Sequence, residues 1–351
     1  MISLESLFDK LEAGRVLERK EAEFFMQQVL SGTLETSLLV SFLHAFNQRP
    51  VHSKELTGFA AVIRQHAAPV FLSGEDRPDW MVDTCGTGGD ACGTFNISTA
   101  AAFVAAGAGA TVAKHGNRAA SSRSGSADVL EALGVRIDLS PRQVGRAIRE
   151  VGIGFLFAPA AHSAMRHAAP ARKEIGKRTV FNLLGPLTNP AGAEAQVLGV
   201  YSPDVIDPVA NTLSALNVGH AFVVCGAGGL DEISLEGETL IAEVRAKQIR
   251  RYTVAPEDFG VARAPLACLL GGSATENAAL MLDLFQQDSG PRRDIVVINA
   301  AAALVASGRA QNFLEGAALA SQAILSGAAL EKLERLISFS NGMPPERPPL
   351  L

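Results

Sequence analysis

The sequence predicts an α/β protein, with a small all-helical N-terminal domain followed by a larger α/β domain with a mainly parallel central sheet. Two observations support this fold class. In the first part of the chain, apolar residues recur at helical spacing and no strand pattern appears among them. From Trp80 onward, short apolar runs alternate with helical segments, as in parallel strands joined by helices. A length of 351 residues also fits two domains.

Apolar stripes predict the helices of the N-terminal domain. In chain order they end at residues that stop helices, namely Gly14, Gly32, Pro50 and Pro69. The stripes are Leu4, Leu7, Phe8 and Leu11; Ala22, Phe25, Met26, Val29 and Leu30; Leu38, Leu39, Phe42, Leu43 and Phe46; and Leu56, Phe59, Ala60 and Ile63. We interpret these stripes as core-facing sides of the helices, because that is the common role of an apolar stripe.

Short apolar runs predict the strands of the second domain. The strand candidates are Trp80–Asp83, Thr111–Ala113, Gly154–Phe157, Gln196–Tyr201, Ala221–Cys225 and Asp294–Ile298. The helices expected between them include Ser126–Leu133, Pro141–Val151 and Val205–Leu216. Ser140-Pro141 is a strong helix start, with serine as the cap and proline at the first helical position. Alternating residues over Leu240–Val254 predict a separate antiparallel ribbon.

These elements predict the domain boundaries. We expect the helical domain to span residues 1–70, joined by helices from about 162–185. The α/β domain is expected to span residues 74–160 and 190–345.

Composition and charge exclude several classes of protein. A net charge of −5 argues against a nucleic-acid coat protein. No apolar stretch free of charge and glycine reaches membrane-spanning length. The 4 cysteines show no metal-ligand spacing, and no signal-peptide pattern accompanies them. We therefore expect a cytoplasmic protein without nucleic-acid or membrane partners.

The glycine-rich segment Asp83–Asp90 is the strongest functional motif. It follows a strand candidate and precedes an alanine-rich helix, so its backbone N–H groups and the helix start can cradle an anion. Its two flanking acids favour a metal-bearing phosphate or a sugar with hydroxyl groups over bare phosphate. The segment has neither a Walker ending nor the dinucleotide spacing. A simple turn is the alternative, since glycine clusters after strands are common.

Two further clusters also follow strand candidates. The basic segment Lys114–Ser126 carries cations, serines and a glycine, and favours a polyanion site over a solvated loop. The adjacent acids Asp231 and Glu232 follow a glycine turn and suit Mg²⁺, which takes its remaining ligands from water and phosphate. Surface decoration is the alternative for such an acid pair.

A fourth cluster spans residues 162–190 and contains His162, Arg166 and Arg172. An arginine near a cleft suits a substrate carboxylate, and a helix-surface arginine is an equally good interpretation of the spacing. No Ser-His-Asp order, zinc spacing or pair of isolated catalytic acids emerges. The chemistry is therefore expected to rely on positioning and charge stabilisation, with no covalent intermediate on the protein.

Together these separated motifs resemble the anthranilate phosphoribosyltransferase family over nearly the whole chain. The matching segments are Gly86–Asp90, Asn96–Thr99, Lys114–Arg118, Asn182–Pro190 and Asp231-Glu232. The resemblance implies transfer of phosphoribosyl from phosphoribosyl pyrophosphate to anthranilate with Mg²⁺ as cofactor, in tryptophan biosynthesis. It also implies the nucleoside phosphorylase-like (class III) phosphoribosyltransferase fold and a homodimer formed through the helical domain.

The resemblance also assigns residues to roles. Phosphoribosyl pyrophosphate is expected at Gly86, Gly88, Gly89, Asp90, Thr94, Asn96, Ser98, Thr99, Lys114 and Ser126. Anthranilate is expected at Gly86, Asn117, Arg172, His115 and His162. The metal is expected at Ser98, Asp231 and Glu232. Lys114 is expected to stabilise the transition state, and no residue is assigned as acid or base.

Two segments depart from the family pattern. Ala91-Cys92-Gly93-Thr94 replaces a small-residue run after Asp90, which predicts a reshaped loop over the substrate. The turn Gln48–His52 lacks the usual sequence, with an expected effect on the domain hinge or dimer surface.

Asp83 receives no role. The alternative functions are a pyrimidine nucleoside phosphorylase of the same fold and a catalytically silent nucleic-acid-binding relative.

Overall fold

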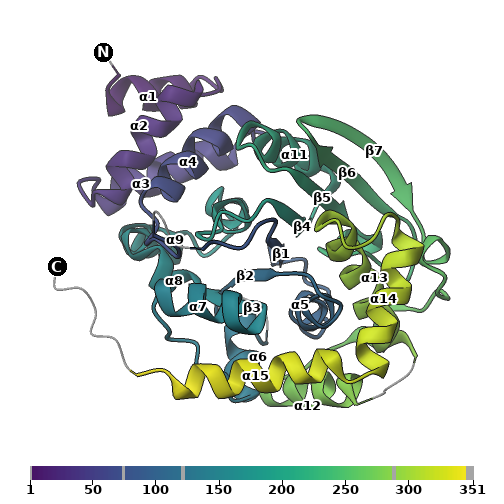
Figure 1. Cartoon of the computed structure of the whole chain (residues 1–351). Helices are drawn as coiled ribbons and strands as arrows, with labels where there is room; N and C mark the ends of the chain where they lie inside the picture. The colour runs from purple at the N-terminus through teal and green to yellow at the C-terminus, as the bar shows by residue number, and fades with distance from the viewer. Residues whose placement is uncertain (1, 73–75, 120–122, 287–289, 345–351) are drawn as a thin grey trace.

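The computed structural model describes residues 2–72, 76–119, 123–286 and 290–344. Its N-terminal part is the helical unit drawn in purple in Figure 1. The helices are α1 (Leu4–Glu12), α2 (Arg19–Leu30), α3 (Thr36–Asn47) and α4 (Ser53–Gln65). Each expected stripe supplies buried residues to this unit, and Phe25 contacts the rings of Phe42, Phe46 and Phe59 at centroid distances of 4.7, 5.6 and 5.8 Å. The helical prediction for this part of the chain is confirmed.

The larger unit is built on a 7-stranded sheet in the order β3-β2-β1-β4-β5-β6-β7. The strands are β1 (Val82–Gly86), β2 (Val112–Gly116), β3 (Ile153–Phe157), β4 (Ala195–Gly199), β5 (His220–Cys225), β6 (Thr239–Arg245) and β7 (Gln248–Val254). Strands β1 to β5 pair in parallel, and β6 and β7 are antiparallel additions at one edge. The mainly parallel sheet is therefore confirmed.

Two expectations about this sheet are wrong. Asp294–Ile298 lies inside the helix α13 (Pro291–Ala306), not in a strand. Ile295 to Ile298 are all buried, so this part of the helix has no polar face to distinguish it from a buried strand. The ribbon at Leu240–Val254 is not separate, because β6 pairs with β5 over His220–Cys225 and so continues the main sheet.

Helices cover both faces of the sheet, as the arrangement in Figure 1 shows. One core joins α5 (Ile97–Gly107) and α13 to strand residues such as Val82 and Phe222. The remaining helices of the α/β unit are α6 (Ser126–Ala132), α7 (Pro141–Val151), α11 (Ile206–Ala215), α12 (Ala274–Phe285), α14 (Phe313–Leu325) and α15 (Ala328–Gly342). Short 3-10 turns are η3 (Pro203–Val205), η4 (Ala227–Gly229), η5 (Pro256–Phe259) and η6 (Leu266–Leu269).

A second core connects the helical unit to the opposite face of the sheet. It contains Phe25 and Phe59 from the helical unit, Leu213 from α11 and Val223 from β5. The connecting segment also contributes to it, through α9 (Ala169–Ile175), α10 (Phe181–Leu184) and η2 (Pro186–Thr188). Two shorter pieces, α8 (Ala158–Ala161) and η1 (Ser163–Ala168), precede them. The helical unit therefore packs on the sheet face through a continuous apolar core.

Among the described residues, no single helix is both long and apolar enough to cross a membrane. The helices α14 and α15 are long and apolar enough only when they are taken together, and they are bent by 63° relative to one another.

Candidate active site

The glycine loop, Lys114 and the acid pair Asp231 and Glu232 gather at the carboxyl ends of β1, β2 and β5, whereas Arg172 lies on α9. This edge is where ligands bind in open parallel sheets. The loop after β1 turns through Gly88 and Gly89, whose φ values of 68° and 73° are strained for residues with a side chain. The loop then leads into α5, while the Lys114 segment ends β2 and the acid pair follows β5. Strand order thus brings the three sequence clusters to one edge.

Hydrogen bonds join the acid pair to the glycine loop. The N–H of Gly88 donates to Asp231 Oδ2 at 2.7 Å, and the N–H of Ser98 donates to Glu232 Oε1 at 3.0 Å. A Cβ on Gly86 would lie 2.8 Å from Asp231 Cγ, so a residue without a side chain is required for this approach. The two acids therefore link the loop, the first turn of α5 and the end of β5.

Crowding of carboxyl groups makes this edge receptive to a cation. Burial raises the pKa of Asp231 to about 7 with a further rise from Asp90, and the pKa of Glu232 to about 8 with a further rise from Asp231. Lys114 acts in the opposite direction on Glu232. The Oδ2 atom of Asp90 is buried without a hydrogen-bond partner in the described structure.

The donor set fits Mg²⁺ rather than a metal held by protein ligands alone. Within the described ranges, no group of three or more His, Cys, Asp or Glu side chains is arranged to hold a metal ion. Magnesium commonly binds through one or two carboxylates and completes its shell with water and phosphate oxygens. Asp231 and Glu232 match that requirement, and Ser98 lies beside them through its hydrogen bond.

Lys114 and Asp83 form a buried, oppositely charged pair of groups beneath the site. The ammonium of Lys114 donates to the carbonyl of Thr84 at 2.5 Å. Asp83 is fully buried and accepts from the N–H of His115 at 3.1 Å and from Asn189 Nδ2 at 2.8 Å. Burial lowers the pKa of Lys114 and raises that of Asp83, and each charge opposes the shift of the other. Asp83 is thus a positioning residue that holds the end of β2.

Asn96 connects the start of α5 to two other elements. Its Nδ2 donates to the carbonyl of Ser124 at 3.2 Å, and its Oδ1 accepts from Asn277 Nδ2 on α12 at 2.9 Å. Thr99 is buried in the next turn, and Thr94 forms a β-bridge with Leu270. Asn277 was not identified from the sequence, because it reaches the site from an element far away in the chain. Asn189 lies in the segment that resembles the family, but the sequence assigned it no role.

The loop after Asp90 is held by backbone hydrogen bonds to the segment around η6. The N–H of Phe95 donates to the carbonyl of Leu269 at 3.1 Å, and the N–H of Gly271 donates to the carbonyl of Gly93 at 2.9 Å. Ala91 has a φ of 60°, an uncommon value for alanine. This loop is thus held by a short pairing with residues at the end of η6 and just after it.

The basic segment is less available to an anion than its composition indicates. Arg118 pairs with Asp128 at 3.0 Å and Glu131 at 2.8 Å on α6, and Arg123 is exposed. Residues 120–122 lie outside the described ranges. Asn117 is exposed, and its N–H donates to the Ser126 hydroxyl at 3.2 Å. Lys114 is thus the cation of this segment that contacts the site.

The residues expected to meet anthranilate lie in two places. His115 and His162 pack edge to face with ring centroids 5.3 Å apart, and both are buried. Burial lowers the pKa of His115 to about 3 and of His162 to about 4, so both rings are neutral at pH 7. Arg172 is exposed on α9, with its guanidinium 5.7 Å from the Phe181 ring centroid. Within the part of the chain that the structure describes, no hydrogen bond or ion pair joins Arg172 to the glycine loop, and its guanidinium lies over Phe181 instead.

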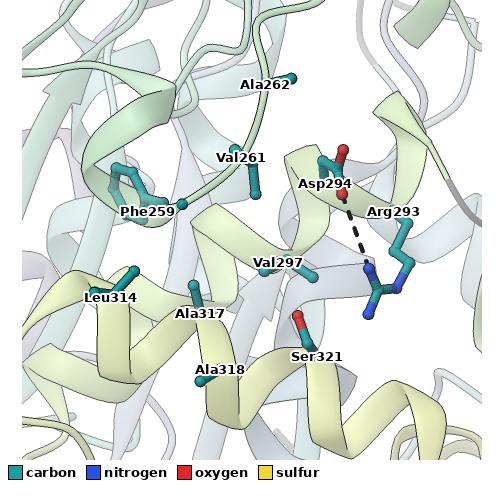
Figure 2. A pocket seen from close by; sticks show the side chains of 11 residues that line it. Phe259, Val261, Ala262, Arg293, Asp294, Val297, Leu314, Ala317, Ala318 and Ser321 are labelled. Carbon is teal, nitrogen blue, oxygen red and sulfur yellow. Dashed lines mark ion pairs between the residues drawn. The ribbon is translucent and has the colours of Figure 1, made fainter.

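A pocket of about 420 Å³ lies away from all these residues. Figure 2 shows it between η5, α13 and α14, with the Arg293–Asp294 ion pair of 3.9 Å at one side. Apolar side chains such as Phe259, Val297 and Leu314 form much of its wall. It contains no residue assigned from the sequence.

Comparison with known proteins identifies the family. The glycosyl transferase family models match the chain twice, with the a/b domain over residues 79–330 and the helical bundle domain over residues 5–67. Anthranilate phosphoribosyltransferase of Symbiobacterium thermophilum is 49% identical over 338 residues, covering 96% of this chain and 98% of that protein.

Solved structures agree with the sequence comparison. The anthranilate phosphoribosyltransferase of Thermus thermophilus superposes with a TM-score of 0.89 at 45% identity, covering 95% of this chain and 99% of that one. The Saccharomyces cerevisiae enzyme, solved in complex with PRPP and Mg, gives a TM-score of 0.88 at 29% identity, with 97% and 98% covered. On sequence and fold, the chain belongs to the anthranilate phosphoribosyltransferase family of the glycosyl transferases.

Proposed function

We propose that this chain transfers the phosphoribosyl group of 5-phosphoribosyl 1-pyrophosphate to the amine of anthranilate and releases pyrophosphate, a step of tryptophan biosynthesis. The observation that carries the proposal is the bonding of Asp231 and Glu232 to the glycine loop and the start of α5, beside Lys114. This arrangement combines carboxylates for a magnesium ion, backbone donors and a cation at one edge of the sheet.

The reaction needs charge stabilisation more than proton transfer. The anthranilate nitrogen forms a bond to C1 of the ribose while the C1–oxygen bond breaks, and the bonding pair leaves with pyrophosphate. The proton of the amine passes to solvent, because an aryl amine is already neutral and needs no strong base. Magnesium, when bound, supplies charge neutralisation at the departing pyrophosphate. Lys114 adds a fixed positive charge on the protein side.

The remaining residues bind and orient. Gly86, Gly88, Gly89 and Asp90 would surround the donor, with Thr94, Asn96, Thr99 and Ser126 supporting the loop ends. Neutral His115 and His162 offer anthranilate a buried aromatic surface. Arg172, with Asn117 and Gly86, would receive its carboxylate, which discriminates against amines that lack one.

We also propose the finer features that the family resemblance implies. These are a domain division at the boundaries expected from the sequence, a cytoplasmic location and a homodimer formed through the helical domain. The core shared by the helical unit and the segment that contains α9 and α10 supports the division.

The fluorescence of anthranilate tests the proposed activity directly. It should fall when the protein, Mg²⁺ and phosphoribosyl pyrophosphate are combined, and stay constant when any one is omitted or when EDTA is added. No change with all components present would remove the proposal. Phosphorolysis of uridine by the same preparation would instead point to a nucleoside phosphorylase.

A further inference from the structure

Arg178 lies against the glycine loop although it follows neither β1 nor β2. It belongs to the segment between α9 and α10. Its Nε lies 2.9 Å from the position that a Cβ on Gly89 would occupy, so the side chain covers this turn of the loop. Its guanidinium carbon is 4.1 Å from the ring centroid of Tyr201, which follows β4 at the same sheet edge.

The charge of Arg178 is not neutralised by protein. Within the described ranges no acidic side chain forms an ion pair with it, and the residue is exposed. Arg118 in the basic segment, by contrast, pairs with two acids. Stacking on Tyr201 uses the face of the guanidinium plane, and the N–H groups at its edge stay available for the forked contact that suits phosphate.

Hydrogen bonds hold the backbone around Arg178 in place. Asn47 at the end of α3 donates from Nδ2 to the carbonyl of Arg178 at 2.9 Å. The N–H of Thr179 donates to Asn182 Oδ1 at 3.0 Å. The position of Arg178 is therefore set by the helical unit and by α10, so this cation reaches the loop from a segment outside the sheet.

We propose that Arg178 binds the pyrophosphate group of the sugar donor, and that Tyr201 holds its guanidinium ready for that contact. The inference rests on the proposed function. The sheet edge places Asp90, Asp231 and Glu232 close to the loop together with Lys114. A donor with several negative charges is repelled by these acids, and the cation of Arg178 beside Gly89 offsets that repulsion. Because Asn47 holds the segment, Arg178 also couples donor binding to the placement of the helical unit.

Calorimetric binding of magnesium pyrophosphate, together with steady-state kinetics, tests the proposal. Arg178→Gln should weaken pyrophosphate binding and raise the KM for the donor about tenfold or more, as expected for loss of a charge-assisted contact. The KM for anthranilate should change by less than about twofold, because Arg172 rather than Arg178 receives its carboxylate. Arg178→Lys should recover part of the loss, since it restores the charge without the planar stack.

Variants at Lys177 and Tyr201 separate a binding role of Arg178 from general effects of charge or stability. Lys177→Gln removes the same charge at the adjacent exposed position and should leave pyrophosphate binding unchanged. Tyr201→Phe keeps the aromatic face and should bind like the wild type, whereas Tyr201→Leu should share part of the defect.

Each possible outcome of the test has a distinct meaning. Equal binding by the Arg178→Gln and Lys177→Gln proteins, or a defect confined to the KM for anthranilate, would overturn the inference. A wild-type protein that binds magnesium pyrophosphate but never consumes anthranilate would refute the proposed function and leave the role of Arg178 supported.

Discussion

At the scale of single residues, Asp83 shows how a buried acid serves a site without touching a ligand. Its oxygens accept from different donors, the backbone of His115 and the amide of Asn189. Asn189 also donates to the carbonyl of Ala113 at 2.7 Å, so the two residues fix the end of β2. Lys114 and His115 are consecutive residues of β2, so their side chains point to opposite faces of the sheet. The anchor formed by Asp83 and Asn189 fixes the orientation of both side chains.

Replacing Asp83 by Asn should remove one of these two contacts. An amide has a single acceptor oxygen, so its NH₂ group must face either the N–H of His115 or the NH₂ of Asn189. We expect a loss of stability of about 1–3 kcal/mol and a larger fall in kcat than in substrate affinity. Thermal unfolding and steady-state kinetics measure both effects. The exposed acid Asp79, changed to Asn, is the control, and equal behaviour of the two variants would contradict the anchoring role.

The raised pKa values of Asp231 and Glu232 predict an unusual dependence of stability on pH. Between about pH 4 and 8 the folded protein holds more protons on these groups than the unfolded chain does, so its stability falls as pH rises. Magnesium binding requires the deprotonated acids, and should therefore raise the melting temperature more at pH 8 than at pH 5.

The variant with Asp231→Asn and Glu232→Gln provides the control for this pH dependence. It should lose the response of the melting temperature to Mg²⁺ and nearly all activity. Over the same pH range, its stability should fall less than that of the wild type. A wild-type response to Mg²⁺ in this variant would argue against the metal assignment.

At the scale of elements, the glycine loop is shaped by what approaches it. Gly86 is required by contact with Asp231, whereas Gly88 has open space around it and is required by its φ of 68°. Arg178 approaches Gly89. Each glycine thus serves a different purpose, and a substitution at each should fail for a different reason.

Gly86→Ala should act mainly on metal binding. The new Cβ would lie 2.8 Å from Asp231 Cγ, so the carboxylate must move away from Gly88. We expect the Mg²⁺ concentration for half-maximal activity to rise about tenfold, which corresponds to about 1.4 kcal/mol. Gly109→Ala, at a φ of 92° with no atom nearby, should cost about 1 kcal/mol of stability without altering the Mg²⁺ requirement. Titration of activity with Mg²⁺ compares the two proteins, and an unchanged requirement in Gly86→Ala would contradict the steric argument.

Elements with clear boundaries were predictable from sequence. Ser140-Pro141 begins α7 with a side-chain cap, and Gly152 ends it in the left-handed conformation. The fully apolar stretch of α13 was mistaken for a strand, because periodicity disappears when every side of a helix is buried. Arg118 was grouped with Lys114 because composition does not show that acids on α6 pair with it. Contacts of high sequence separation, such as that of Asn277 with Asn96, left no local pattern to read.

At the scale of the whole molecule, the helical unit and the sheet share one apolar core. A buried ion pair supports the helical side, where Arg49 Nη1 donates to Glu55 Oε2 at 2.9 Å and Glu55 Oε1 accepts from the N–H of Leu17 at 2.8 Å. Arg49 lies in the turn that precedes α4, and its ion pair with Glu55 holds that turn to the helix. Because the core is continuous, damage at Glu55 is expected to reach the sheet.

Glu55→Gln leaves a buried arginine without its counter-charge, and should destabilise the protein by about 3 kcal/mol. Trp80 is the only tryptophan of the chain and donates from its indole to the carbonyl of Ala306, so its fluorescence reports on the α/β unit. For the Glu55→Gln protein in urea, the unfolding midpoint reported by Trp80 fluorescence should shift by the same amount as the midpoint reported by far-UV circular dichroism. A shift in dichroism alone would show that the two units unfold independently. Glu18→Gln, which alters an exposed ion pair with Lys54, is the control.

The bond between Gly88 and Asp231 also bears on how the protein acquires activity during folding. Its partners are separated by 143 positions in the chain, and the site gains its acid pair only when β5 has joined the sheet beside β4, which in turn pairs with β1. Such long-range closure is slow compared with helix formation. During refolding, helical dichroism should therefore recover well before the protein binds magnesium pyrophosphate. Binding of this ligand then reports completion of the sheet.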